Sequence, residues 1–180
     1  MTDSAAGPHS TLVALLRAVN VGGTGKLAMS DLRSMCSALG FSEVRTYIAS
    51  GNVLFSTSVG ADAARAALEE ALREYAGKPV GVLLRTPTEL ERICVENPFL
   101  DAHPSRVGVT FLDAAPDPET PARATGADDE EIALGAREVY VHYPSGMGRS
   151  RLNVPTGRRL ATTRNMNTVT RLAALSTGPG

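Results

Sequence analysis

The 180-residue chain has no tryptophan, two cysteines and two lysines, and these scarcities exclude several classes of protein. Cys36 and Cys94 are too few for a disulfide framework and too isolated for a metal site. No apolar run approaches the ~18 residues of a membrane-spanning helix. The first ten residues lack a basic segment followed by an apolar stretch, so the sequence predicts no secretory signal. We therefore expect a cytoplasmic protein that has no membrane partner.

What the sequence does have is the composition of a folded protein. Hydrophobic residues make up 43% and charged residues 21% of the chain, which is typical of globular domains and sufficient for a core. The net charge of −1 is unevenly spread, because residues 144–180 carry six arginines and no acid, whereas residues 112–131 carry seven acids and one arginine. Such asymmetry indicates either an anionic partner at the basic end or pairing of the two blocks within the molecule.

The first half alternates between strand-like and helix-like segments. Strand patterns occupy residues 11–18, 44–49, 52–57 and 80–85. Helical periodicity predicts one helix capped by Ser30 and ended by Gly40, and a second over 61–75 whose apolar face includes Tyr75. Ser50-Gly51 has the composition of a hairpin turn. The resulting β-α-β-β-α-β order requires two helices on one face of a four-stranded sheet, as in a ferredoxin-like plait.

The second half repeats this order more loosely. Thr86, Pro87 and Glu89 predict the start of a linking helix, and Asn97-Pro98 is the expected domain boundary. A strand over 106–112, a hairpin over 131–134 and 138–143, and a final helix capped by Thr163 or Asn165 follow. We therefore expect an α+β fold of two ferredoxin-like (alpha-beta plait) units with antiparallel sheets and helices on one face, the second unit less regular. Their expected extents are a flexible tail at 1–9, a first unit at 10–97 and a second at 98–180.

The glycine-rich segment Gly22-Gly23-Thr24-Gly25-Lys26 suggests two phosphate-binding motifs, and it fits neither. Leu27 stands where a Walker loop needs Ser or Thr for magnesium. A dinucleotide site needs an acidic residue at the end of the second strand, which here ends at Ala49-Ser50, and a parallel sheet that the predicted hairpin excludes. We interpret the segment as a flexible connection whose amides, with Asn20 and Lys26, are still able to hold an anion.

Catalytic constellations are sparse. The three histidines, His9, His103 and His142, lie in separate segments, and none has a metal-ligating partner at helical spacing. We expect no metal site and no cofactor, and we interpret the acidic block as a solvated surface. The segment Gly146–Arg149 favours a tight loop after a hairpin over an anion-binding nest of amides beside Arg149 and Arg151.

Three separated blocks carry a family resemblance. They are Leu15–Gly23 with Lys26 and Arg45–Val53, then Glu138–Pro144 with Gly146, Gly148, Arg149 and Ser150, and finally Thr163–Val169. Together they resemble the domain-of-unknown-function 1697 family of uncharacterised bacterial proteins. Ala18 and Met166 depart from the glycine and the tryptophan common at those places. The resemblance implies a pair of ferredoxin-like units and brings no established activity.

The resemblance also marks polar residues and glycines at strand ends and in loops. The resulting candidate ligand-binding residues are Arg17, Asn20, Gly22, Gly23, Lys26, Ser50, Asn52, Tyr143, Arg149, Arg164 and Asn165. A fold needs glycines at such places, but it seldom needs so many cationic side chains there. Two of the candidates have structural alternatives, because Asn52 is suited to a hairpin turn and Asn165 to a helix cap.

Three functions remain open from the sequence. The first is a binding protein for an anionic, phosphate-bearing ligand, either nucleic acid or a nucleotide-like molecule, held in a cleft between the two units; arginine suits this role because its planar fork grips phosphate. The second is a metal-independent enzyme acting on a phosphorylated or carboxylated metabolite, with Arg17, Lys26 and Arg164 holding the anion and Tyr143 or an acid moving a proton. The third is a structural or oligomeric module whose arginines pair with the acidic block. The oligomeric state is left open.

Overall fold

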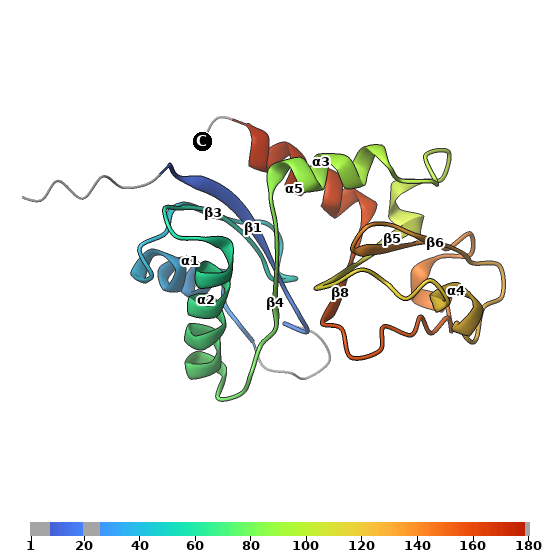
Figure 1. Cartoon of the computed structure of the whole chain (residues 1–180), viewed down its shortest axis with the longest axis horizontal. Helices are drawn as coiled ribbons and strands as arrows, with labels where there is room; N and C mark the ends of the chain where they lie inside the picture. Colours follow the sequence, from blue (N-terminus) through green and yellow to red (C-terminus); the bar gives the residue numbers. More distant parts are fainter. Residues whose placement is uncertain (1–7, 20–25, 179–180) are drawn as a thin grey trace, which may run out of the picture. The chain divides into compact units, whose positions relative to one another are not determined.

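The computed structural model describes residues 8–19 and 26–178. The chain forms two α+β units, each built on a four-stranded antiparallel sheet (Figure 1). The first unit extends to Pro87 and includes the last residues from Ser176, and the second comprises Thr88–Leu175. Most of the tail predicted at 1–9 lies outside the described residues.

The first unit has the predicted β-α-β-β-α-β order. Its elements are β1 (Ser10–Leu16), α1 (Met29–Ala38), β2 (Ser42–Thr46), β3 (Asn52–Thr57), α2 (Ala61–Ala76) and β4 (Val82–Arg85). The strand order is β2-β3-β1-β4, and the neighbouring strands are antiparallel. Helices α1 and α2 lie side by side on one face of this sheet (Figure 1). The finer classification as a ferredoxin-like plait stays a prediction.

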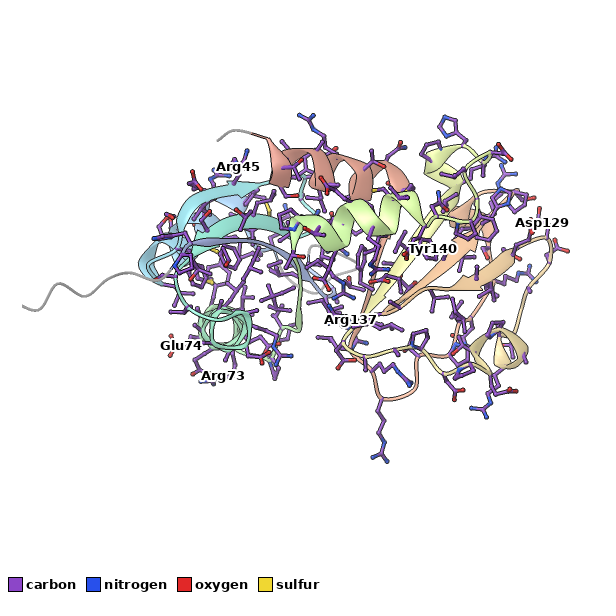
Figure 2. All side chains as sticks on the ribbon, turned by 45° about the horizontal axis from the view of Figure 1, so that its top comes forward. Arg45, Arg73, Glu74, Asp129, Arg137 and Tyr140 are labelled. Atoms are coloured by element: carbon purple, nitrogen blue, oxygen red, sulfur yellow. The ribbon has the colours of Figure 1, made fainter. Side chains whose placement is uncertain are left out.

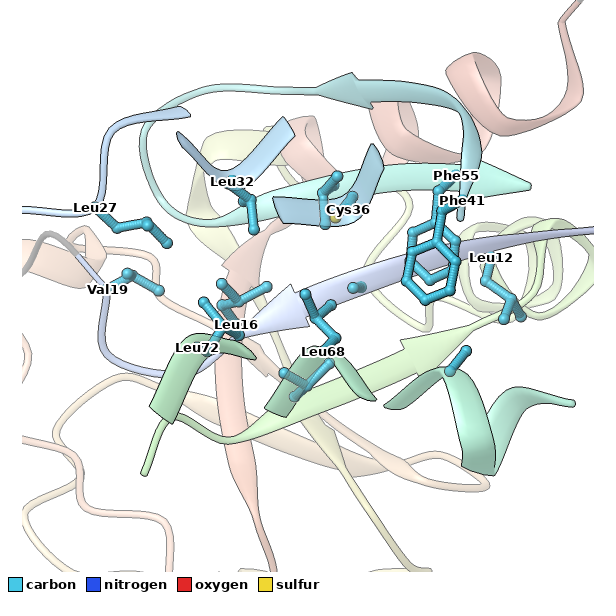
Figure 3. Close-up of a cluster of buried hydrophobic side chains, with 14 residues drawn as sticks. Leu12, Leu16, Val19, Leu27, Leu32, Cys36, Phe41, Phe55, Leu68 and Leu72 are labelled. Atoms are coloured by element: carbon cyan, nitrogen blue, oxygen red, sulfur yellow. The ribbon is translucent and has the colours of Figure 1, made fainter. Parts of the chain in front are cut away.

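Alternation along β1 builds the core of the first unit. Leu12, Ala14 and Leu16 point to the face covered by the helices, as a period of two requires. The helices contribute Leu32 and Cys36 from α1 and Leu68 and Leu72 from α2, all fully buried. At one end of the cluster the rings of Phe41 and Phe55 stack with their centroids 4.3 Å apart (Figure 3).

Two local predictions in this unit are wrong. Ala28 occupies the N-cap position of α1 without a side-chain hydrogen bond, and Ser30 lies inside the helix, so Ser30 is not the cap. Tyr75 does not join the buried face of α2. Its side chain is 47% exposed, and its hydroxyl donates to Asp31 Oδ2 over 2.8 Å, so the polar tip of the ring draws it to the surface.

The boundary between the units lies ten residues before the predicted Asn97-Pro98. Helix α3 (Pro87–Val95) belongs almost entirely to the second unit, because its contacts are there. The Tyr140 hydroxyl donates to the carbonyl of Ile93 over 3.1 Å, and Figure 2 shows Tyr140 next to this helix. The composition signal at Asn97-Pro98 marks the end of the helix and not the end of a domain.

The second unit repeats the strand order of the first. After α3 it contains a 3-10 turn η1 (Pro104–Arg106), β5 (Val107–Leu112), α4 (Thr120–Arg123), β6 (Glu131–Leu134), β7 (Glu138–His142), a 3-10 turn η2 (Met147–Arg149), β8 (Ala161–Asn165) and α5 (Met166–Thr177). The sheet order β6-β7-β5-β8 places the unit's second strand first, then its third, first and fourth, as in the first unit.

Strand β8 was not predicted from the sequence. Its residues Ala161–Asn165 lack an apolar run, and only Thr162 and Arg164 are buried. Pairing with β5, from Gly108↔Asn165 to Leu112↔Ala161, is what makes this segment a strand. Tertiary pairing thus overrides a weak local preference.

Candidate functional site

In the first unit, the predicted site residues divide between the surface and one turn. Arg17 and Lys26 are exposed, and the backbone amide of Arg17 donates to Gly81 O over 2.9 Å. Asn52 is buried, and its Nδ2 donates to Tyr47 O over 3.0 Å and to Ser50 Oγ over 2.9 Å. Asn52 and Ser50 therefore stabilise the hairpin turn. The predicted residues Asn20, Gly22 and Gly23 lie outside the described part of the chain.

In the second unit, two of the four predicted residues, Arg164 and Asn165, have side-chain hydrogen bonds to their own strand or helix. Asn165 Oδ1 accepts from the Thr168 amide over 3.0 Å, which is the N-cap bond of α5. Arg164 lies within β8 and is 7% exposed. Its Nη1 donates to Thr162 Oγ1 over 2.7 Å and to Thr163 O over 3.0 Å. Burial lowers the pKa of this guanidinium to about 10, so it remains charged at neutral pH.

Tyr143 and Arg149 lie where the chain leaves β7. The half-buried Tyr143 packs against the cluster formed by Val139 and Val141. Burial, together with the negative charge of Glu130, raises the pKa of the Tyr143 hydroxyl. Arg149 is exposed at the end of η2. Of the four residues predicted in this unit, Arg149 lines a pocket.

That pocket has a volume of about 600 Å³ and is formed by two loops of the second unit, within the usual range for small-molecule sites. One loop precedes β6 and the other follows β7. The lining residues are Gly126, Ala127, Asp128, Asp129, Glu130, Ser145, Gly146, Arg149, Ser150 and Arg151. We call this the loop pocket.

The acidic side of the loop pocket is fixed by hydrogen bonds. The Ser145 hydroxyl donates to Asp129 Oδ2 over 2.6 Å, and Figure 2 shows Asp129 at the outer edge of its loop. Glu130 accepts from the Asp128 amide over 2.7 Å and from the Ser150 hydroxyl. These donors, the amide first, lower the pKa of Glu130, so this carboxylate stays ionised and holds the two loops together.

The basic side of the loop pocket consists of Arg149 and Arg151. Within residues 8–19 and 26–178, neither guanidinium forms an ion pair, although three carboxylates line the same pocket. This differs from Arg123, which pairs with Asp117 over 2.9 Å inside the acidic block. The pocket therefore presents two cationic forks and several carboxylate oxygens to one volume.

Backbone constraints hold the walls of the loop pocket in place. Thr125 and Asn153 form an antiparallel bridge through amide–carbonyl bonds of 3.1 and 2.8 Å. Gly126 has φ +73°, and a Cβ there would lie 2.3 Å from Arg151 O. No side chain fits at Gly126 while the loops keep this spacing. The site is thus preorganised by main-chain contacts.

The loop pocket has the chemistry of a binding site for a polar ligand. Arginine forks bind phosphate or carboxylate in two-pronged fashion, and carboxylates accept hydrogen bonds from hydroxyl and amino groups. In the described chain, no group of three or more His, Cys, Asp or Glu side chains is arranged to hold a metal ion. The guanidinium and carboxylate groups in the pocket lining suit recognition by hydrogen bonds and charge.

Sequence reasoning missed most of this pocket, although one signal for it was present. We interpreted Asp128, Asp129 and Glu130 as a solvated surface. A hairpin over 131–134 and 138–143 was predicted, and a hairpin brings the residues just before its first strand beside those just after its second. In the structure Glu131 pairs with His142. That register brings the end of the acidic block to the start of the basic segment.

Comparison with known proteins gives a family and a fold. A family described as "Protein of unknown function (DUF1697)" matches residues 10–140, a range that includes the acidic loop of the pocket. The solved structure of the conserved bacterial protein SP0830 from Streptococcus pneumoniae is similar, with a TM-score of 0.77 and 21% identity; it covers 94% of this chain and 100% of its own. At that identity the likeness shows the fold alone. None of the curated proteins compared matches this chain.

A membrane-spanning helix is also lacking in the part of the chain that the structure describes, because none of its helices is long and apolar enough to cross a bilayer.

Proposed function

The chain belongs to the DUF1697 family of proteins of unknown function, and we propose that it binds a small phosphate-bearing ligand with free hydroxyl groups, of the nucleotide or sugar-phosphate type, in the loop pocket. The observation that carries this proposal is the placement of Arg149 and Arg151, without ion-pair partners in the described chain, opposite hydrogen-bonded carboxylates around one volume of about 600 Å³.

The charges in the pocket favour a small ligand over nucleic acid. One phosphate group suits the two guanidinium groups, whose charge-assisted hydrogen bonds are worth about 1.5–3 kcal/mol each. Asp128 and Asp129 then supply acceptors for ribose or sugar hydroxyls. A polynucleotide would bring further phosphates toward the carboxylates of Asp128, Asp129 and Glu130. These negative charges would repel each other within one pocket.

Neither of the other two functions gains a specific observation. Burial and the charge of Glu130 raise the pKa of Tyr143, which moves this hydroxyl away from proton transfer at neutral pH. Internal pairing of the charge blocks does not account for Arg149 and Arg151, because neither pairs with a carboxylate among the described residues.

Calorimetric titration of the full chain tests this proposal. The probes are adenosine 5′-monophosphate, ribose 5-phosphate, adenosine and inorganic phosphate, with a short single-stranded RNA as the polyanion. We expect adenosine 5′-monophosphate and ribose 5-phosphate each to bind more tightly than adenosine or inorganic phosphate. Arg149→Gln and Arg151→Gln should each weaken binding by about tenfold, which corresponds to about 1.4 kcal/mol.

Arg158→Gln is the matched control, since Arg158 is exposed, has the same charge and is not among the residues that line the pocket. It should leave the affinity unchanged. Equal losses for all three variants would show general charge attraction and contradict a defined site. Tighter binding of RNA than of the monomers, with a steep salt dependence, would favour the nucleic-acid alternative.

A further inference from the structure

A second, chemically different pocket lies within the first unit, at the end of its core. It has a volume of about 220 Å³. Val19, Leu27 and Leu72 form its apolar wall; they are 9%, 6% and 1% exposed. Figure 3 shows Val19 and Leu27 at the same end of the cluster as Leu72. The ring of Tyr75 also lines this pocket.

Two cations stand at this apolar pocket. Lys26 and Lys78 are the only lysines in the chain, both are exposed, and both line the pocket. Neither has an ion-pair partner among residues 8–19 and 26–178. Asp31 accepts the hydroxyl hydrogen bond of Tyr75, which also lines the pocket.

Lys78 follows Gly77, whose left-handed backbone ends α2, and a cation there offsets the negative end of the helix. Lys26 precedes α1, whose N-terminal end does not attract a cation. Like Lys78, it lines the pocket together with Tyr75 and Ala76 at the C-terminal end of α2. Two lysines far apart in the sequence thus converge on one apolar pocket.

From this combination we infer that the first unit binds a small apolar monocarboxylate, an aromatic or branched-chain acid, with its hydrocarbon body against Val19, Leu27 and Leu72 and its carboxylate between Lys26 and Lys78. The volume of about 220 Å³ is below the ~300–1,000 Å³ of sites for drug-sized ligands, so it suits one ring or one branched chain. The exposed apolar lining, which includes Ala18, Tyr75 and Ala76, disfavours a bare inorganic anion, because that surface is covered only by a ligand with a hydrocarbon part. This inference is independent of the loop pocket and of its ligand.

The scarcity of lysine makes a direct experiment available. Reductive methylation of the full chain with ¹³C-formaldehyde labels the two lysine side chains and the N-terminal amine and preserves their charge; Lys26→Gln and Lys78→Gln assign the two lysine signals. We expect sodium benzoate, titrated at constant ionic strength, to shift both lysine signals along saturating curves with one shared dissociation constant. Benzyl alcohol, which has the same ring without the charge, and inorganic phosphate should each give smaller shifts that do not saturate.

Variants separate a built site from a general effect of charge. Lys26→Gln and Lys78→Gln should each weaken benzoate binding about fivefold, the size of an exposed ion pair of about 1 kcal/mol, followed on the remaining lysine signal. Arg73→Gln, which removes an exposed charge from α2 at a residue outside the pocket lining, should leave the affinity unchanged. The inference is overturned if the signals follow ionic strength alone, if phosphate matches benzoate, or if Lys26→Gln binds as the parent does.

Discussion

Glu138 shows how a single charged residue fixes α3 on the sheet of the second unit. Its carboxylate has no exposed surface. It accepts from Arg92 Nη2 over 3.3 Å and from the Arg137 amide over 3.1 Å. Arg92 on α3 reaches across to β7, and Arg137 pairs in turn with Glu89 on α3. A buried carboxylate tolerates this position only while its partners remain.

We predict that Glu138→Gln destabilises the protein by about 2 kcal/mol, measured by urea denaturation. Removing one partner of a buried pair typically costs about 3–5 kcal/mol, and the smaller figure is expected because Arg92 is partly exposed and keeps Glu96. Glu96→Gln is the matched control: it neutralises the exposed partner of the same arginine and should cost less than about 0.5 kcal/mol. Equal costs for the two variants would contradict the role assigned to Glu138.

The buried thiol of Cys36 should make the protein less stable at alkaline pH. Burial raises the pKa of its thiol to about 12, against an ordinary value of about 9. The unfolded chain therefore releases this proton first, and the stability contributed by the protonated thiol is fully present below pH 9 and is lost as the pH rises from 9 to 12. Cys36 is fully buried, whereas Cys94 is only partly buried.

The measurement is the free energy of unfolding at pH 8 and at pH 10 in the parent and in Cys36→Ala. The free energy of unfolding should fall by roughly 1 kcal/mol more in the parent than in the variant over this interval. Above the pKa of the unfolded thiol, this free energy falls by about 1.4 kcal/mol for each pH unit. The comparison uses the change with pH, so the cost of the substitution itself cancels. The same pH dependence in both proteins would show that Cys36 does not control it.

At the scale of elements, Asn165 connects β8 to α5. It pairs with Gly108 in the sheet and caps the helix through its bond with the Thr168 amide. We predict that Asn165→Ala costs about 1 kcal/mol of stability, the usual value for losing an N-cap, and that Asn165→Asp restores most of it. Asn167→Ala, at an exposed position of the same helix, should have little effect in the same thermal or urea denaturation experiment. Full stability of Asn165→Ala would contradict the capping role.

Elements with strong local signals were predictable from the sequence. Helix α2 spans Ala61–Ala76, one residue more than the predicted 61–75, and ends at Gly77 with φ +69°. The hairpin of β6 and β7 occupies nearly the predicted residues. Elements that depend on distant partners were not predictable. Strand β8 exists because β5 pairs with it, and α3 joins the second unit because of contacts with Tyr140 and Glu138, which local composition does not encode.

The candidate site shows the same division between local and distant information. The roles of Asn52 and Asn165 as turn and cap residues followed from their side-chain chemistry and their positions. Arg149 was predicted as a site residue, but the carboxylates that line the loop pocket with it were not. Asp128 and Asp129 come from a segment whose composition is typical of a solvated surface. The register of β6 and β7 is what brings the two loops together.

At the scale of the whole molecule, the uneven charge along the chain is explained by where the individual arginines lie. The six arginines of residues 144–180 do not act as one basic patch. Arg164 is held within β8, Arg159 Nε donates to Ala115 O over 2.6 Å, and Arg149 and Arg151 line the loop pocket beside the end of the acidic block. Opposite charges from distant segments thus meet in one pocket, which we propose as the binding site.

An amide chemical-shift map of the ¹⁵N-labelled chain, titrated with ribose 5-phosphate, tests whether the two loops bind one ligand. We expect the largest saturating shifts in residues 126–130 and 145–151 together, and we expect Arg149→Gln to reduce the shifts in both loops. Shifts confined to one loop, spread evenly over exposed basic residues, or unchanged in Arg149→Gln would contradict a site built from the two loops.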